Sequence, residues 1–326
     1  MQILQFIFFG VILAYTSVSQ AFQFQWFGPL AGTDSYDYTP SWIADTTVGY
    51  DRIWWCGNDP DDGAGDVIWY KDNINPTPQV VMRPTEPWEG IYVCDPSVVY
   101  GQFNPPGMNK TYSMAMYYTA TDDNGVNNKV GVAFSNNGIN WDKYPNNPII
   151  TPKVSNSGFY GSGETQARNT DGISNIQLWY FDNSDGTENV YERTSSDGVN
   201  FGSPTALSKN GLPSSARIGG SGIALSPSQP YELYWIFAEF VGVNPGGKLG
   251  LWKISFGNRF SGTWTFLDYI YPASVGENVI FEPGFRTDIY GNITPVSWPA
   301  IWVGFGCGDG WINQANTWDL CQAGGQ

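Results

Sequence analysis

The chain has 326 residues, a formal net charge of −15 and no histidine. The negative charge argues against nucleic acid as a partner, because nucleic-acid recognition needs a basic surface. Without histidine the chain has no Ser-His-Asp triad, no Cys-His pair and no imidazole metal ligand. Any acid–base chemistry must therefore come from carboxylates, with tyrosine as a remote option. An acidic chain rich in aromatic residues suits sugars, cations or an extracellular structural role.

The first 21 residues contain an apolar run from Ile3 to Tyr15, followed by small residues that include Ser19 and Ala21. This pattern is typical of a secretory signal peptide, so we expect a mature domain of residues 22–326. A membrane anchor is the alternative, but the run is short for a span of about 20 residues. No later segment is apolar enough to span, so we expect a secreted, extracellular protein with no membrane partner.

A short phrase recurs at the start of strand-like runs, at intervals of roughly 60 residues. Its copies begin at Thr39, Asp95, Glu164, Ser221 and Glu282. A period of this size indicates repeated supersecondary units. The first residue of each copy should then point at a common centre, which would place Asp95, Glu164 and Glu282 in one pocket. The alternative is that Asp-Pro and Glu-Pro are ordinary turns before a strand.

Each repeat contains short runs rich in β-branched and aromatic residues, separated by Gly, Asn, Asp and Pro. The runs are 38–44, 52–56, 66–70 and 79–82; 95–100, 112–119, 129–135 and 148–151; 164–168, 176–181, 190–194 and 205–208; 221–225, 231–238, 249–255 and 263–267; and 282–290, 300–306 and about 317–321. Such units predict an all-β, five-bladed β-propeller in a single domain. We expect residues 22–27 to supply the missing last strand and close the ring. A β-sandwich or β-helix is the alternative.

Four cysteines in an oxidising compartment suggest two disulfides, with three possible connectivities. In the register above, Cys56 ends a strand of the first unit and Cys94 opens the second on the same face, while Cys307 and Cys321 flank one hairpin. We therefore predict the pairs Cys56–Cys94 and Cys307–Cys321. Zinc is less favoured, because the spacings contain no CxxC pair.

Two N-glycosylation sequons begin at Asn109 and Asn292. Both fall in loops between the first and second strands of a unit, on the face opposite the expected pocket. The turns between second and third strands are acidic, at residues 58–66, 121–124 and 182–185. Clustered oxygen ligands suit calcium, but Asp, Asn and Gly are also the ordinary residues of hairpin turns. We expect no required cofactor or metal, with calcium as the open alternative.

Five segments carry a family resemblance: residues 94–98, the hairpins 135–141 and 195–201, and residues 147–150 and 161–164. Together they resemble the five-bladed propellers of glycoside hydrolase family 43 and its relatives in families 32, 62 and 117. The resemblance covers nearly the whole mature chain. It implies a first-blade Asp that acts as base, a second-blade Asp that tunes pKa values and orients, and a third-blade Glu that acts as acid. On this resemblance Asp95 is the tuning residue and Glu164 the acid.

The chain departs from the family pattern at the base position, which holds Thr39. Asp37, two residues earlier, is one candidate substitute and Glu282 is another. Arg217 and Arg286 are candidate contacts for an anionic sugar, with structural ion pairs as the alternative. The frequent fifth-blade histidine of the family is also absent. The departure leaves open a rearranged hydrolase or a non-hydrolytic relative.

Aromatic residues in the expected pocket-face links are candidate sugar contacts, or else they fill the wedges between blades. They are Trp88, Phe159, Tyr160, Tyr271 and Trp311. The leading interpretation is a secreted propeller that binds and hydrolyses a plant- or algal-type glycan, in the inverting manner if active. One alternative is a lectin-like pseudoenzyme with carbohydrate as its partner. Another is a structural subunit of an extracellular coat or filament that self-associates.

Overall fold

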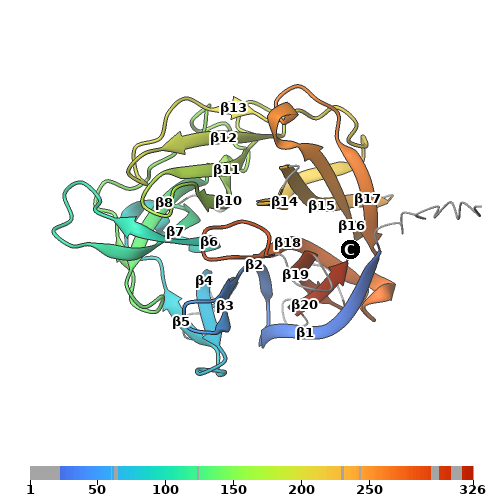
Figure 1. Cartoon of the computed structure of the whole chain (residues 1–326), viewed down its shortest axis with the longest axis horizontal. Coiled ribbons are helices and arrows are strands. Elements are labelled where there is room, and N and C mark those ends of the chain that lie inside the picture. The colour runs from blue at the N-terminus through green and yellow to red at the C-terminus, as the bar shows by residue number, and fades with distance from the viewer. Residues whose placement is uncertain are drawn as a thin grey trace, which may run out of the picture.

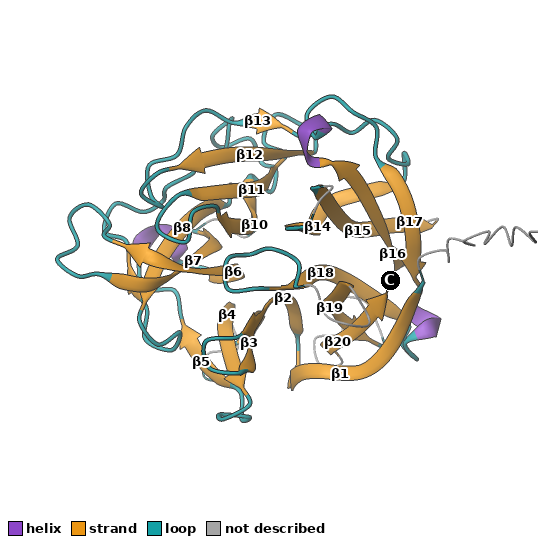
Figure 2. Ribbon diagram, in the orientation of Figure 1, coloured by secondary structure: helices purple, strands orange, loops and turns teal. Residues whose placement is uncertain are grey.

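The computed structural model describes residues 23–59, 61, 65–122, 125–228, 231–241, 244–294, 301–309 and 318–325. The expected signal peptide and Trp311 lie outside these residues. Strands dominate the described chain, as expected, and the helical pieces are three short 3-10 turns (Figure 2). These are η1 (Pro87–Glu89), η2 (Phe256–Asn258) and η3 (Pro272–Ser274). Within the described part, no helix is long and apolar enough to cross a bilayer.

Three antiparallel sheets contain four consecutive strands each. The first has β6 (Tyr92–Phe103), β7 (Tyr112–Thr121), β8 (Lys129–Ser135) and β9 (Asp142–Lys143). The second has β10 (Ser162–Asn169), β11 (Ile176–Asp182), β12 (Asn189–Ser195) and β13 (Thr205–Ala206). The third has β14 (Ala216–Leu225), β15 (Glu232–Val241), β16 (Asn244–Ser255) and β17 (Thr265–Ile270). Each of these sheets is a four-stranded blade.

The remaining strands form an eight-stranded sheet. One half is β2 (Asp37–Asp45), β3 (Tyr50–Asn58), β4 (Asp66–Asp72) and β5 (Gln79–Met82). The other half is β18 (Val279–Thr287), β19 (Ile301–Gly308), β20 (Trp318–Gly325) and β1 (Phe24–Ser35). A short parallel contact between β18 and β2 joins the halves. The N-terminal β1 runs antiparallel to the C-terminal β20, so it occupies the outer edge where we expected a strand.

The first strand of each blade lies nearest the centre of the molecule, where β2, β6, β10, β14 and β18 surround a common axis (Figure 1). Buried aromatic and aliphatic side chains fill the space between neighbouring blades. In one such cluster, Phe103 and Phe134 of the second blade pack with Leu178 of the third. Burial of this kind supplies the main stabilisation of a β fold, at about 25 cal/mol per Å² of apolar surface.

The two disulfides are confirmed. Cys56 pairs with Cys94 at a Cα–Cα distance of 5.0 Å, which ties β3 to β6. Cys307 pairs with Cys321 at 5.8 Å, across neighbouring strands β19 and β20. One expected strand was misplaced, because the outer strand of the second blade is β9, whereas the run 148–151 contributes only an isolated bridge from Ile150 to Val130.

A loop of residues 288–294 closes one end of the central axis, and it is drawn in orange-red at the centre of Figure 1. Its backbone carbonyls accept hydrogen bonds from the amides of Tyr100 (2.7 Å) and Asn169 (2.9 Å). Its Ile293 amide donates to the carbonyl of Leu225 at 2.9 Å. We call residues 288–294 the plug. It bonds to three different blades, so the axis is covered on the face where the inner strands end.

Candidate active site

The recurring phrase corresponds to a β-bulge in the inner strand of every blade. At each bulge the register with the second strand skips, and the residue two positions before the pairing resumes has a left-handed backbone. The non-glycine examples are Thr39 (φ 48°), Asp95 (50°), Glu164 (53°) and Glu282 (48°). Such residues usually occur where function or tight geometry requires them.

In the fourth blade the equivalent residue is Gly220, with φ 65°, rather than Ser221. The sequence-based register was wrong there by one position. The equivalence follows from the residue at which pairing with the second strand resumes, which is Gly222 in the fourth blade and Gln166 in the third. Gly220 and Glu164 each lie two positions before that residue. Glycine adopts the left-handed conformation without a steric penalty. The fourth blade therefore forms the same bulge without placing a carboxylate at the site.

Gly219 and Gly220 lie between two of the carboxylates. The Gly220 amide donates a hydrogen bond to Oε2 of Glu164. A Cβ added at Gly219 would lie 3.5 Å from Oε1 of Glu164. A Cβ added at Gly220 would lie 2.7 Å from Cγ of Glu282. The glycine pair therefore brings Glu164 and Glu282 to the same short stretch of backbone from opposite neighbouring blades.

Thr39 is bonded directly to this carboxylate group. Its hydroxyl donates to Oε2 of Glu282 at 2.6 Å. The position that the family resemblance assigns to a base thus holds a hydroxyl that binds the fifth-blade carboxylate. Thr39 is 5 % exposed, and Glu282 is half-buried.

Asp95 completes the group of three carboxylates and receives several hydrogen bonds. The hydroxyl of Tyr160 donates to its Oδ2 at 3.0 Å, and Thr119 bonds it as well. The Glu164 amide donates to the Thr119 hydroxyl at 2.9 Å, which links the second and third blades. Asp95, Glu164 and Glu282 therefore lie together, as expected from the repeat, and Tyr160 is part of the same site.

The pKa values of all three carboxyl groups are raised. For Glu164 the chief cause is burial, and the charges of Asp95 and Glu282 add to it. Burial and then Asp95 raise the pKa of Glu282, while the Thr39 hydroxyl lowers it. Burial raises the pKa of Asp95, and the bonds from Thr119 and Tyr160 oppose that rise. Close carboxyl groups cannot all ionise together, so some hold protons where free acids would be charged.

Asp66 is a fourth carboxyl group that sequence reasoning did not identify as part of the site. It begins β4, accepts the hydroxyl of Tyr38 at 2.6 Å, and has a pKa raised to about 6 by burial. Its charge also raises the pKa of Glu282. The tyrosines Tyr36 and Tyr92 lie near this group. Burial and then the charges of these carboxylates raise the pKa of both hydroxyls. No local motif marks Asp66, because its position depends on the pairing of β3 with β4.

Asp37 does not join this group. Its side chain is fully buried, and it accepts bonds from the Thr33 amide at 2.6 Å and from Nε1 of Trp55 at 2.6 Å. Burial raises its pKa to about 6. These bonds make Asp37 a link between β1, β2 and β3, so Glu282 is the remaining substitute for the missing base.

Three other expected contacts lie in different surroundings. Arg286 forms a two-pronged ion pair with Asp51, with N–O distances of 2.8 and 2.7 Å, at the opposite end of the inner strand from Glu282. Trp88 is half-buried and packs beside Tyr118, with ring centroids 5.9 Å apart, so it fills a wedge. Arg217 has an exposed side chain directly before the bulge of β14.

The acidic turns carry carboxylates that already have partners among the described residues. Asp59 bonds to Arg83 at 3.0 and 3.1 Å. Asp185 bonds to Lys153 at 2.6 Å. Asp182 accepts the Ser162 hydroxyl at 2.7 Å. These bonds account for Asp59, Asp182 and Asp185 as parts of hairpins, and calcium binding in the acidic turns stays an untested alternative.

The two sequons differ in accessibility. Asn109 is exposed in the loop between β6 and β7. Asn292 is 8 % exposed within the plug, accepts Nε of Arg168 at 2.6 Å, and donates from Nδ2 to Asp288 at 3.1 Å. Because the Asn292 side chain is buried, a bulky glycan on its Nδ2 has no room in the folded plug, so glycosylation at this position conflicts with the fold.

No protein-family model matches the chain, and no curated protein matches it in sequence. Solved structures do match. An α-L-arabinofuranosidase of Lactobacillus brevis is 10% identical over 90% of this chain and 91% of that one, with a TM-score of 0.54. A family 117 glycoside hydrolase of the marine bacterium Zobellia galactanivorans is 13% identical over 94% and 90%, with a TM-score of 0.58.

An α-L-arabinanase of Penicillium chrysogenum, solved with arabinobiose, is 11% identical over 92% of this chain and 98% of that one, with a TM-score of 0.56. The matches cover nearly the whole length of both chains. They confirm that this chain has the fold of the propeller glycoside hydrolases that resemble family 43.

Proposed function

We propose that this protein is a secreted glycoside hydrolase-like enzyme, built as a five-bladed propeller closed by β1, that acts on a plant- or algal-type glycan. The observation that carries the proposal is the meeting of Glu164 and Glu282 around Gly219 and Gly220, with Asp95 of a third blade close enough for its charge to raise the pKa of both. The pairing of β1 with β20 and the two disulfides support ring closure and an oxidising, extracellular location.

Glu164 is the proposed general acid. Its raised pKa keeps the proton on at pH values where a free glutamate would be ionised, and an acid needs that proton in order to protonate the departing sugar oxygen. The Gly220 amide holds its Oε2, so the direction of the carboxyl group is fixed. Asp95 is the proposed tuning residue, because its charge is a cause of the raised pKa of Glu164.

Glu282 is the proposed base, in place of an aspartate at the Thr39 position. Thr39 would orient it through the 2.6 Å hydrogen bond and leave the other carboxylate oxygen for a water molecule. In the inverting mechanism, the base activates a water on the face of the sugar opposite the acid. Glu164 and Glu282 come from blades on either side of the fourth, which suits such an arrangement.

The test is an assay of the purified mature protein on arabinan, related pentose polymers and algal polysaccharides, with analysis of the products. Arabinan is the first substrate to try, because an arabinanase and an arabinofuranosidase share the fold. Proton NMR of the first product formed reports whether the anomeric configuration is inverted. Absence of cleavage of all these glycans between about pH 4 and 8 would contradict the proposal.

A lectin-like function is the second candidate, and a specific observation favours it. The hydroxyl of Thr39 replaces the carboxylate at the family's base position, and it satisfies Glu282 rather than leaving it free. A lectin would bind the same glycans on a glycan array and release no product. Binding and product release therefore separate the two candidates.

A further inference from the structure

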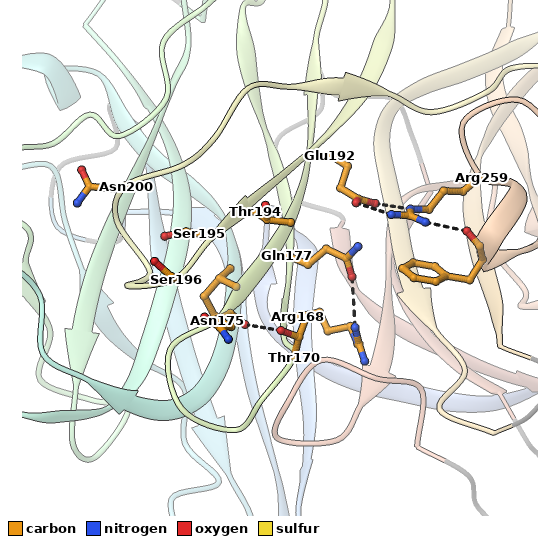
Figure 3. Close-up of a pocket in the computed structure, with 12 residues that line it drawn as sticks. Arg168, Thr170, Asn175, Gln177, Glu192, Thr194, Ser195, Ser196, Asn200 and Arg259 are labelled. Atoms are coloured by element: carbon orange, nitrogen blue, oxygen red, sulfur yellow. Dashed lines mark hydrogen bonds and ion pairs between the residues drawn. The ribbon is translucent and has the colours of Figure 1, made fainter.

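A polar cavity of about 630 Å³ opens between the third and fourth blades (Figure 3). Its lining includes Arg168 near the end of β10, whereas Glu164 lies near the beginning of the same strand. The cavity is therefore at the opposite end of the blade from the carboxylate site. It has no part in the proposed catalytic function.

Arg168 is the residue on which the inference rests. Its half-buried guanidinium donates from Nε to Oδ1 of Asn292 at 2.6 Å and from Nη1 to Oε1 of Gln177 at 3.3 Å. Both partners are neutral amides. Arg52, Arg83, Arg259 and Arg286 instead make ion pairs with carboxylates. Burial lowers the pKa of Arg168 and the charges of Asp288 and Glu192 oppose that effect, but no carboxylate among the described residues forms an ion pair with it.

Gln177 supplies a second group with unused hydrogen-bonding capacity. Its side chain is only 4 % exposed, and its Oε1 is occupied by Arg168. Its Nε2 is left facing the cavity in Figure 3. Both side chains thus offer N–H donors to the same space, and a ligand there must supply acceptors.

The one carboxylate of the lining adds no free negative charge. Glu192 accepts Nε of Arg259 at 2.7 Å and Nη2 of Arg259 at 2.8 Å, and Trp179 donates to it at 2.9 Å. Since Glu192 is paired with Arg259, Arg168 is the cation of the described lining that has no ion pair, and the charge of Asp288, which bonds to Asn292, acts on it without a direct bond. This cation lies in a chain whose formal net charge is −15. An anionic ligand would find its favourable surroundings here rather than among the carboxylates of the other face.

The rim of the cavity has the chemistry that suits sugar hydroxyls. Hydroxyl and amide side chains line it, with one aromatic ring from the fourth blade. They are Thr170, Asn175, Thr194, Ser196, Asn200 and Phe256. The cavity is open to solvent along this rim, so a sugar within a longer chain can enter it.

We propose that this cavity binds the carboxylate of a uronate residue in a glycan chain, held by Arg168 and Gln177. A guanidinium binds a planar carboxylate through two parallel N–H bonds, which gives both strength and orientation. The amide of Gln177 donates to the same carboxylate or to a neighbouring ring hydroxyl. The rim hydroxyls and amides hold the rest of the sugar.

The experiment is calorimetric titration of the full mature chain with trigalacturonate and, separately, with the neutral galactose trimer. We expect saturable binding of the uronate trimer that weakens as ionic strength rises, and at least tenfold weaker binding of the neutral trimer. Arg168→Gln should lower the uronate affinity roughly tenfold or more, since it removes a charged hydrogen-bond donor. Gln177→Leu keeps the side-chain size, leaves Arg168 in place, and should lower the affinity several-fold.

Two controls accompany the titration. Arg193→Gln removes the same charge from β12 of the same blade, where Arg193 bonds to the Tyr180 hydroxyl at 3.1 Å, and should leave the affinity unchanged. Glu164→Gln should also leave it unchanged, which separates this site from the catalytic one. Equal binding of the neutral trimer, an unchanged affinity in both cavity variants, or equally tight binding of inorganic sulfate would overturn the proposal.

Discussion

Four non-glycine residues with left-handed backbones, Thr39, Asp95, Glu164 and Glu282, define the centre of the site. For an L-residue this conformation costs about 1–2 kcal/mol, so the surrounding bulges must enforce it. The bulge turns each side chain away from the regular alternation of the strand and toward the axis. The same backbone device in different blades therefore brings distant residues together.

Gly220 should not tolerate a side chain. An added Cβ would lie 2.7 Å from Cγ of Glu282, so Gly220→Ala should displace that carboxylate and destabilise the protein by about 1–3 kcal/mol beyond the backbone strain. Denaturant unfolding and hydrolysis assays measure the two effects.

Gly276→Ala is the matched control. Gly276 also has a left-handed backbone, with φ 80°, but an added Cβ would have no atom within 4 Å. It should cost only the backbone term of about 1 kcal/mol and leave activity intact. Equal effects of the two substitutions would show that Gly220 does not position Glu282.

Asp66 should make stability fall as pH rises. Burial raises its pKa in the folded protein from 3.8 to about 6, so the folded state binds the proton more tightly than the unfolded state. Its stabilising effect is present below about pH 4 and is lost as pH rises through about 6. Asp66→Asn should remove this contribution and raise stability at pH 7 by about 1–2 kcal/mol.

Asp142 provides the control of opposite sign for that experiment. The bond from Lys110 lowers its pKa, so its contribution is lost as pH falls. Urea unfolding of Asp66→Asn, Asp142→Asn and the parent from about pH 2 to 7 compares the slopes, with the effect of Asp142 expected below about pH 4 and that of Asp66 above it. Asp37, Asp95, Glu164 and Glu282 also have raised pKa values, so Asp66→Asn should make the parent slope smaller without abolishing it. A slope in Asp66→Asn equal to that of the parent would refute the assignment.

At the scale of elements, the sequence located most strands to within a few residues, and the clear exception was the two-residue outer strand β9. The run 79–82 coincides with β5, and 176–181 lacks only the last residue of β11. The run 148–151 was misplaced, because short outer strands have few buried positions and so carry little periodic pattern. Turn residues and β-branched runs locate a strand reliably only when the strand is long enough for its sequence to show which residues face each side of the sheet.

The site was predictable in part for a related reason. The repeated phrase marks Asp95, Glu164 and Glu282, because the bulge that positions each of them is local. Asp66 and Asp37 could not be placed correctly, since their roles depend on hydrogen bonds to Tyr38 and Trp55 across strands. The glycine pair 219–220 was an available signal for the fourth bulge.

The plug should depend on Asn292. Its side chain joins Arg168 to Asp288, so Asn292→Ala should lower the free energy of unfolding by about 1–3 kcal/mol. Asn109→Ala removes the exposed sequon and should change stability by less than about 0.5 kcal/mol. Thermal unfolding of the unglycosylated proteins compares them, and equal stability of both would contradict the role of Asn292.

At the scale of the whole molecule, the pairing of β1 with β20 joins the two chain ends in one blade. Removing residues 22–32 should expose the edge of β20, lower cooperativity and cause aggregation. Thr33 is retained in this truncation because its amide bonds to Asp37. Size-exclusion chromatography and thermal unfolding provide the readouts, and the peptide 22–32 added separately should restore the monomer. A truncated chain that stays monomeric and equally stable would count against closure by β1.

The central claim is that Glu164 and Glu282 together perform acid–base hydrolysis of a glycan. The most direct measurement is the rate of product release from the best glycan substrate by the parent, Glu164→Gln and Glu282→Gln, with Glu277→Gln as a control outside the site. Each of the two site variants should lose about two to four powers of ten in rate while still binding the glycan, and the control should keep its rate. Glycan binding without product from the parent, or full activity in either site variant, would contradict the claim.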